Sequence, residues 1–84
     1  MLEHEVTITN ATGLHAHASA KLVQILGVFK SQVTLIGKGR EVNAKSIMGV
    51  MLLAAGPGTV LKVKVNGEDE NDAWKVVQQF FAEM

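Results

Sequence analysis

The chain has 84 residues, no cysteine, and eight lysine and arginine side chains balanced by eight aspartates and glutamates. A chain of this length builds one small core, so we expect a single domain over residues 1–84 that needs neither disulfides nor a structural metal. The formal charge is zero, so no basic surface attracts nucleic acid, and one tryptophan and three phenylalanines give few rings on which bases could stack. Nucleic-acid binding is therefore not expected. The acidic start and the lack of a long apolar run predict a cytoplasmic protein without signal peptide or membrane insertion.

The first half of the chain shows patterns of a strand, a helix and a second strand. Residues 5–9 alternate polar and apolar side chains, which indicates a strand with one buried face and His4 at its frayed edge. Apolar residues then repeat at the helical period from about residue 16 to residue 28. Residues 32–36 indicate the next strand. The helix is expected to bury Leu22, Ile25, Leu26 and Phe29, and to expose His17, Lys21 and Gln24.

The second half predicts a hairpin, a short helix, a strand and a final helix. Gly-Lys-Gly at residues 37–39 turns the chain into a short strand over residues 40–42. Ser46 stands at the capping position of a helix over residues 47–55, which is apolar almost all round. Residues 61–65 alternate strictly, with lysines on the open face. Acidic residues complement the start of the last helix, whose buried face is expected to comprise Trp74, Val77, Phe80 and Phe81.

The order of elements is therefore β-α-β-β-α-β-α, without linkers or repeats. Because the strands alternate, only one face of the sheet is buried, which favours an antiparallel or mixed sheet with all the helices on that face. The predicted fold class is α+β, an open-faced sandwich.

A polar turn brings His15 directly to the start of the first helix. Gly13, just before it, can adopt backbone conformations that are closed to other residues. The first N–H groups of a helix have no partners within it, so they would point toward whatever the imidazole carries. A neutral imidazole is also a good nucleophile near neutral pH. The residues predict an anion held on His15; the alternative is a surface histidine without a function.

Two separate motifs carry a family resemblance. Gly-Leu-His-Ala occupies residues 13–16, and Asn-Ala-Lys-Ser-Ile-Met-Gly-Val-Met occupies residues 43–51. The two motifs stand at the spacing typical of HPr, the histidine phosphocarrier family of the bacterial sugar phosphotransferase system, and the chain resembles this family over essentially its whole length. The resemblance implies a four-stranded antiparallel sheet covered by three helices. It also implies that His15 accepts a phosphoryl group on Nδ1 from enzyme I and passes it to IIA domains of sugar permeases. Such a protein is a monomeric carrier without a cofactor, rather than a stand-alone enzyme.

Residues 17 and 18 depart from the family pattern, which usually has Arg followed by Pro. His17 is only partly charged at neutral pH, whereas an arginine is permanently charged and binds phosphate with two donors. Ala18 regains the N–H that proline lacks, so the backbone N–H groups of Ala16, His17 and Ala18 are expected to hold the phosphate. His17 either contacts the phosphate or is simply solvated. A metal site at His15 and His17 is disfavoured, because residues two apart on a helix diverge and no third ligand is evident.

The second motif implies regulation and docking. Ser46 matches the family's regulatory serine, which a kinase phosphorylates in many Gram-positive bacteria, but it could equally be a cap alone. The periodicity does not decide whether Ile47 or Val50 is the buried residue. An alternative function is a regulatory HPr-like adaptor with weakened transfer, acting through Ser46 or protein docking; a third is a nitrogen-related branch. The partner-docking residues implied by the family are Ala16, Ala20, Ile47, Met48, Met51 and Leu52.

Overall fold

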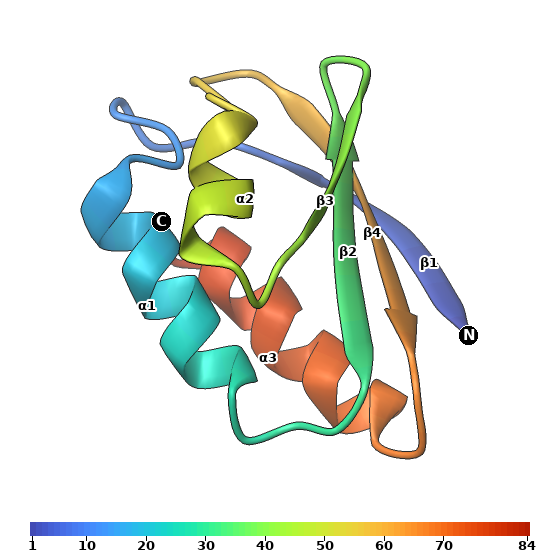
Figure 1. The fold of residues 1–84 in the computed structure, drawn as a ribbon. Helices are drawn as coiled ribbons and strands as arrows, with labels where there is room; N and C mark the ends of the chain where they lie inside the picture. The colour runs from blue at the N-terminus through green and yellow to red at the C-terminus, as the bar shows by residue number, and fades with distance from the viewer.

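A computed structural model describes residues 1–84 and contains four strands and three helices in the expected order (Figure 1). None of the three helices combines the length and apolar character needed to cross a membrane. The elements are β1 (Leu2–Thr7), α1 (Ala16–Leu26), β2 (Gln32–Gly37), β3 (Arg40–Asn43), α2 (Ile47–Leu52), β4 (Val60–Asn66) and α3 (Glu70–Ala82).

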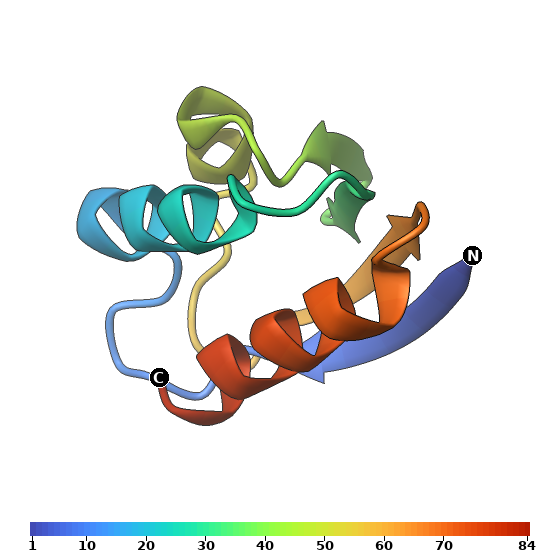
Figure 2. The same cartoon turned by 90° about the horizontal axis from the view of Figure 1, so that it is seen from below.

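The four strands form one sheet in the order β1-β4-β2-β3, and every neighbouring pair is antiparallel. The sequence pattern allowed an antiparallel or a mixed sheet, and the structure has the antiparallel one. Figure 2 shows all three helices on one side of this sheet, as the α+β open-faced sandwich requires.

The core lies between the sheet and the helices, because alternate side chains of each inner strand point toward the helices. In β4, Leu61, Val63 and Val65 are fully buried, whereas Lys62 is exposed on the open face beside Glu3 of β1, with 3.1 Å between Nζ and Oε1. The helices complete a cluster of 16 buried apolar residues. The helical members of this cluster are Leu22 and Leu26 of α1, Val50 of α2, and Ala73, Val77 and Phe81 of α3.

The first strand differs from the sequence prediction. It spans Leu2–Thr7, so His4 lies within β1 rather than at a frayed edge. The His4 ring stacks on Trp74 of α3, with 4.1 Å between ring centroids and an interplanar angle of 9°. His4 thus lies on the same face of β1 as Leu2 and Val6, although it remains exposed. Because histidine is polar, a search for alternating apolar residues does not detect this start of the strand. Trp74 and Phe80 are only half-buried against the core.

Two helices end earlier than their apolar patterns suggest. In α1, the Gly27 N–H bonds to the Gln24 carbonyl at 3.2 Å, so the last turn tightens and the helix stops at Leu26. Ile25 and Phe29 are only half-buried. In α2, the helix stops at Leu52 because the chain reverses into a left-handed conformation at Ala54, with φ of 47°.

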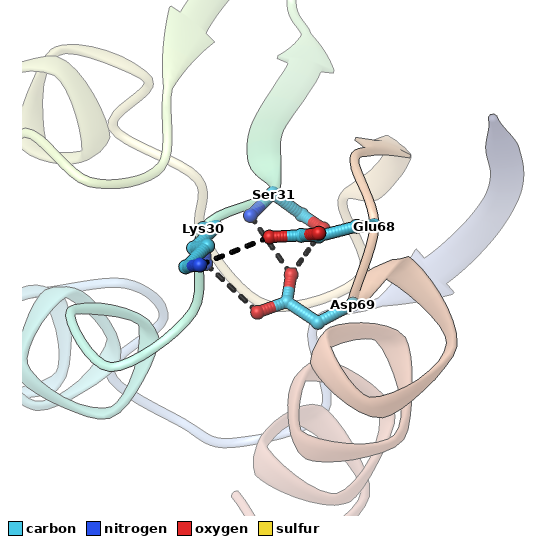
Figure 3. A network of polar contacts seen from close by, with 4 residues as sticks. All are labelled: Lys30, Ser31, Glu68 and Asp69. Atoms are coloured by element: carbon cyan, nitrogen blue, oxygen red, sulfur yellow. Dashed lines mark hydrogen bonds and ion pairs between the residues drawn. The ribbon is translucent and has the colours of Figure 1, made fainter.

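A polar joint ties the segment between α1 and β2 to the start of α3 (Figure 3). Asp69 Oδ2 accepts from the Lys30 N–H and Oδ1 from the Ser31 N–H, both at 2.9 Å, and the Ser31 hydroxyl also donates to Oδ1. Lys30 Nζ lies 3.1 Å from Glu68 Oε1. The Ser31 hydroxyl and the Lys30 N–H together lower the pKa of Asp69 to about 2. Asp69 therefore holds two segments together instead of capping α3 with its side chain.

Candidate functional site

The loop that carries His15 is bound to the segment that follows α2. The Leu14 N–H donates to the Ala55 carbonyl at 2.8 Å, and the Leu14 side chain is buried in the core. Gly13 has φ of 66°, and a Cβ added there would collide with the same carbonyl oxygen. Glycine is therefore required at this position both for its backbone conformation and for the close approach. The loop is fixed against the core, so the residue after it has a defined position.

His15 is the N-cap residue of α1, with an extended backbone (φ −79°, ψ −179°). Its Nδ1 accepts a hydrogen bond from the His17 N–H at 3.2 Å. A ring nitrogen that accepts a hydrogen bond carries a lone pair, so the proton of the neutral ring is on Nε2. The imidazole is exposed to solvent. The unprotonated Nδ1 thus lies at the helix N-terminus, on the surface of the molecule.

The backbone around Nδ1 offers hydrogen-bond donors that have no acceptor in the protein. The first bond of α1 joins the Ser19 N–H to the His15 carbonyl at 2.8 Å, so the N–H groups of residues 16–18 have no partner within the helix. Of these three, only the His17 N–H is engaged, by Nδ1 of His15. No acidic side chain lies in the first turn. The site therefore favours an anion, through free donors and the positive end of the helix dipole.

His17 lies beside His15, as a phosphate-contacting residue must, and its side chain is exposed. The two rings are nearly parallel, with 6.2 Å between centroids and 11° between planes. Both interpretations of His17 remain compatible with this geometry, because the ring is adjacent to the site and also reaches solvent. The structure contains no group of three or more histidine, cysteine, aspartate or glutamate side chains placed to hold a metal ion.

The second sequence motif forms the N-terminus of α2. Ser46 has an extended backbone, and its hydroxyl oxygen accepts from the Gly49 N–H at 3.1 Å, which is the predicted cap. Beyond it, Met48 is 75% exposed, whereas Val50 is fully buried. The question that periodicity left open is thereby answered: Val50 faces the core and Ile47 is 44% exposed. The six residues that the family resemblance implies for docking are all exposed on α1 and α2, and we call them the docking patch: Ala16, Ala20, Ile47, Met48, Met51 and Leu52.

Sequence reasoning missed the residues that support the site without touching a ligand. Ala55 accepts the bond from Leu14, and Lys38 Nζ donates to the Ala54 carbonyl at 3.0 Å. Lys45, which precedes Ser46, donates from Nζ to the Phe29 carbonyl beyond the end of α1. The sequence offered only one signal for the first contact, the Gly-Pro-Gly run at residues 56–58, which indicated a turn but not what packs against it.

An exposed histidine at a helix N-terminus, with free backbone donors beside its Nδ1, suits a protein that carries a phosphoryl group. The family model described as PTS HPr component phosphorylation site matches residues 2–83. A phosphocarrier protein HPr from Xylella fastidiosa is 62% identical over 81 residues, covering 96% of this chain and 91% of that protein. One from Cupriavidus necator is 55% identical over 73 residues, covering 87% and 82%. The crystal structure of an HPr from Thermoanaerobacter tengcongensis superposes with a TM-score of 0.92 at 40% identity, covering 98% of this chain and 92% of that one.

The chain therefore belongs to the HPr family of the phosphotransferase system, and its function is that of a phosphocarrier.

Proposed function

We propose that His15 is the phosphoryl acceptor, that its Nδ1 takes the group from enzyme I, and that the group then passes to IIA domains of sugar permeases. The observation that carries this proposal is the 3.2 Å hydrogen bond from the His17 N–H to Nδ1. That bond holds the lone pair of Nδ1 at the helix N-terminus, where incoming negative charge is stabilised.

The transfer needs little chemistry from this chain. The Nδ1 lone pair forms a bond to phosphorus while the bond between phosphorus and the donor atom breaks, and the proton on Nε2 stays in place. The His17 N–H, no longer facing a lone pair, can donate to a phosphate oxygen together with the unpaired N–H groups of Ala16 and Ala18. The charge assistance that an arginine would give is replaced in part by His17 and in part by the additional N–H of Ala18.

The docking patch is proposed as the surface that both partners use in turn. It lies beside His15, because α1 and α2 are neighbours on the helical layer (Figure 1). Met48 and Met51 are exposed and flexible, which suits a surface that must fit partners of different shape. Ser46 lies at one edge of the patch, where an added phosphate would place charge beside Ile47 and Met48. We further propose that a kinase can use this serine, and that the protein works as a cytoplasmic monomer.

The test is incubation with enzyme I and phosphoenolpyruvate, followed by intact mass measurement. We expect one added phosphoryl group that is stable to base and labile to acid, as a phosphorus–nitrogen bond is. His15→Ala should abolish the adduct, and His17→Ala should only slow its formation. An adduct of full occupancy on His15→Ala would contradict the assignment.

A regulatory adaptor is the second candidate, and the replacement of the family's Arg-Pro pair by His17 and Ala18 favours it. Its distinguishing property is a weak carrier function with intact docking. If enzyme I binds the chain well but transfer to a IIA domain is lost and returns in His17→Arg, the adaptor is the better description.

A further inference from the structure

The side chain of Asn10 closes the loop between β1 and α1. Its Nδ2 donates to the Gly13 carbonyl at 3.1 Å and to the Thr12 hydroxyl oxygen at 3.2 Å. The amide oxygen could not replace Nδ2 in the first bond, because two oxygen atoms would then face each other without a proton between them. The amide of Asn10 is therefore fixed in one orientation, with its nitrogen toward the loop.

The bond to Gly13 holds one end of a peptide group whose other end is also held. The Gly13 carbonyl and the Leu14 N–H belong to the same planar unit and point in opposite directions. The Leu14 N–H donates to the Ala55 carbonyl at 2.8 Å, and Asn10 binds the carbonyl end. A planar group that is bonded at both ends cannot rotate without breaking one of these bonds. His15 follows Leu14, so the orientation of this peptide group directs the imidazole.

A role in stability does not account for Asn10. Its Oδ1 is buried and has no hydrogen-bond partner in the protein. The free energy lost by burying an unpaired acceptor is comparable to the gain from one or two ordinary hydrogen bonds. Of the two bonds from Nδ2, the one to Thr12 is exposed, so water competes for both groups. Asn10 therefore contributes little net stability, and its bond to Gly13 is better explained by what that bond positions.

Asn10 also lies against the first turn of α1. It lines the same groove as His17 and Ala18, whose N–H groups stand at the start of the helix. Asn10 makes no hydrogen bond to His15 or to these N–H groups, because Nδ2 is used in the loop and Oδ1 has no partner. Any influence of Asn10 on the imidazole therefore passes through the peptide group that follows Gly13.

We propose that Asn10 is a positioning residue for phosphoryl transfer. By holding the Gly13 carbonyl, it keeps the imidazole of His15 at the helix N-terminus, where Nδ1 meets the His17 N–H. Without this bond the peptide group is held at one end only, and the imidazole samples orientations in which Nδ1 is not aligned with the incoming phosphorus. The inference rests on the proposed function, since it takes His15 as the acceptor.

The first test is the rate at which Asn10→Ala and wild type accept the phosphoryl group from phosphorylated enzyme I. The rate is measured as a function of the concentration of this chain. We expect kcat to fall about tenfold, because the reacting nitrogen is less well aligned. KM should stay the same, because Asn10 is not part of the docking patch.

The second test is the pair of imidazole nitrogen chemical shifts of His15 in the unphosphorylated protein. At about pH 8.5 a histidine ring is neutral, and the two shifts report which nitrogen carries the proton. Wild type should show a protonated Nε2 and an unprotonated Nδ1, as the hydrogen bond from the His17 N–H requires. In Asn10→Ala the two shifts should lie closer together, because that hydrogen bond forms for less of the time and the tautomers mix.

Two further variants locate the effect. Thr12→Ala removes the exposed partner of Nδ2 and leaves the bond to Gly13, so this matched control should have the kcat and ring shifts of wild type. Asn10→Leu keeps the shape of the side chain, removes the donor together with the unpaired acceptor, and should behave as Asn10→Ala does. It also replaces Asn10→Ala if that variant does not fold, which urea denaturation determines.

Three results would each overturn the inference. One is an unchanged pair of ring shifts in Asn10→Ala and Asn10→Leu, because the imidazole would then be positioned without this bond. Another is a raised KM at unchanged kcat, which would assign Asn10 to docking. The last is an equal loss of kcat in Thr12→Ala, which would assign the effect to the loop as a whole.

These failures are distinguishable from a failure of the proposed function. The ring shifts of His15 are measured without phosphate, so they respond to Asn10→Ala even if another residue takes the phosphoryl group. An error in the acceptor would instead appear as a full adduct on His15→Ala.

Discussion

At the scale of single residues, the proposed phosphate site depends on the charge of His17, the residue beside His15. The His17 ring is 6.2 Å from the His15 ring and is exposed, so it can assist a phosphate only by its charge and its N–H donors. A histidine loses its charge within the physiological pH range, whereas a guanidinium does not. In the proposed mechanism the two histidines have opposite requirements, because His15 must be neutral to attack and His17 must be charged to assist.

The pH dependence of transfer follows from this conflict. We predict that the ratio of the His17→Arg rate to the wild-type rate rises from about pH 6 to pH 8.5, because an arginine keeps its charge over this range and histidine side chains in general do not. The measurement is phosphoryl acceptance from one enzyme I preparation, so that its own titration cancels. A ratio that stays constant over this range would make His17 a spectator.

Ala54 is a second residue with a testable conformation. Its φ of 47° places an alanine in the left-handed region, which costs about 1–2 kcal/mol for a residue with a Cβ. Ala54→Gly removes that strain but makes the unfolded chain more flexible by about 0.4–1 kcal/mol. We therefore expect a net gain of about 0.5–1 kcal/mol in the free energy of unfolding, measured by urea denaturation. As a control, Ala20→Gly in α1 should lose about 1 kcal/mol, and a loss at both positions would contradict the account of Ala54.

At the scale of elements, α2 combines a side-chain cap and an exposed apolar face in six residues, Ile47–Leu52. Its cap is the Ser46 hydroxyl, and its outer face presents Met48, which is 75% exposed. A negative charge at the cap favours the helix electrostatically but lies beside apolar docking residues.

Ser46→Asp is therefore expected to change binding more than folding. We predict at least about a tenfold weaker affinity for enzyme I, with a change below about 1 kcal/mol in the free energy of unfolding. Calorimetric titration and urea denaturation measure the two quantities. Ser46→Asn, which caps without charge, serves as the control. Equal affinities for Ser46→Asp and Ser46→Asn would reduce Ser46 to a cap.

The elements also show what sequence patterns can and cannot predict. The strict alternation in β4 correctly predicted which side chains face the core and which face solvent, because successive side chains of a strand point to opposite faces of the sheet. The predicted strand over residues 5–9 began too late and ended too late, since β1 spans Leu2–Thr7. Its start was missed because His4 is polar yet packs on Trp74. The ends of α1 and α2 were too late, since they depend on a local tightening at Gly27 and on the left-handed turn at Ala54. Neither feature changes the apolar pattern.

At the scale of the whole molecule, the predicted order of elements and the α+β sandwich are confirmed, because they follow from periodicity along the chain. The contacts that fix the site and the joint at Asp69 link segments that are distant in the sequence, and they produce no periodic pattern along the chain. The Leu14 N–H bonds to the Ala55 carbonyl, and the Ser31 hydroxyl to Asp69. The local sequence was enough to select His15 as the candidate site residue. The hydrogen bond to its Nδ1 and the contact between Leu14 and Ala55 could be found only in the three-dimensional structure.

The joint at Asp69 makes stability depend on pH. Its pKa is lowered from an ordinary 3.8 to about 2, chiefly by the Ser31 hydroxyl, so the folded state favours the carboxylate more than the unfolded chain does. The stabilisation is therefore present above about pH 4 and is lost as the pH falls toward 2. We predict that Asp69→Asn is less stable than wild type at neutral pH and that this difference shrinks between pH 4 and pH 2.

Thermal unfolding at a series of pH values measures that difference. Asp72→Asn removes an exposed carboxylate from the first turn of the same helix without touching the joint, and serves as the control. A difference between wild type and Asp69→Asn that is constant with pH would contradict the role of the charged joint.

The most direct test of the site is the position of the phosphoryl group on the phosphorylated protein. A long-range proton–nitrogen spectrum of the imidazole rings distinguishes Nδ1 from Nε2, and the backbone amides report new hydrogen bonds in the same sample. We predict phosphate on Nδ1 of His15, with the amide protons of Ala16, His17 and Ala18 moving downfield as they bond to its oxygens. Phosphate on Nε2, or on Nδ1 without any change at these three amides, would contradict a site built on the helix N-terminus.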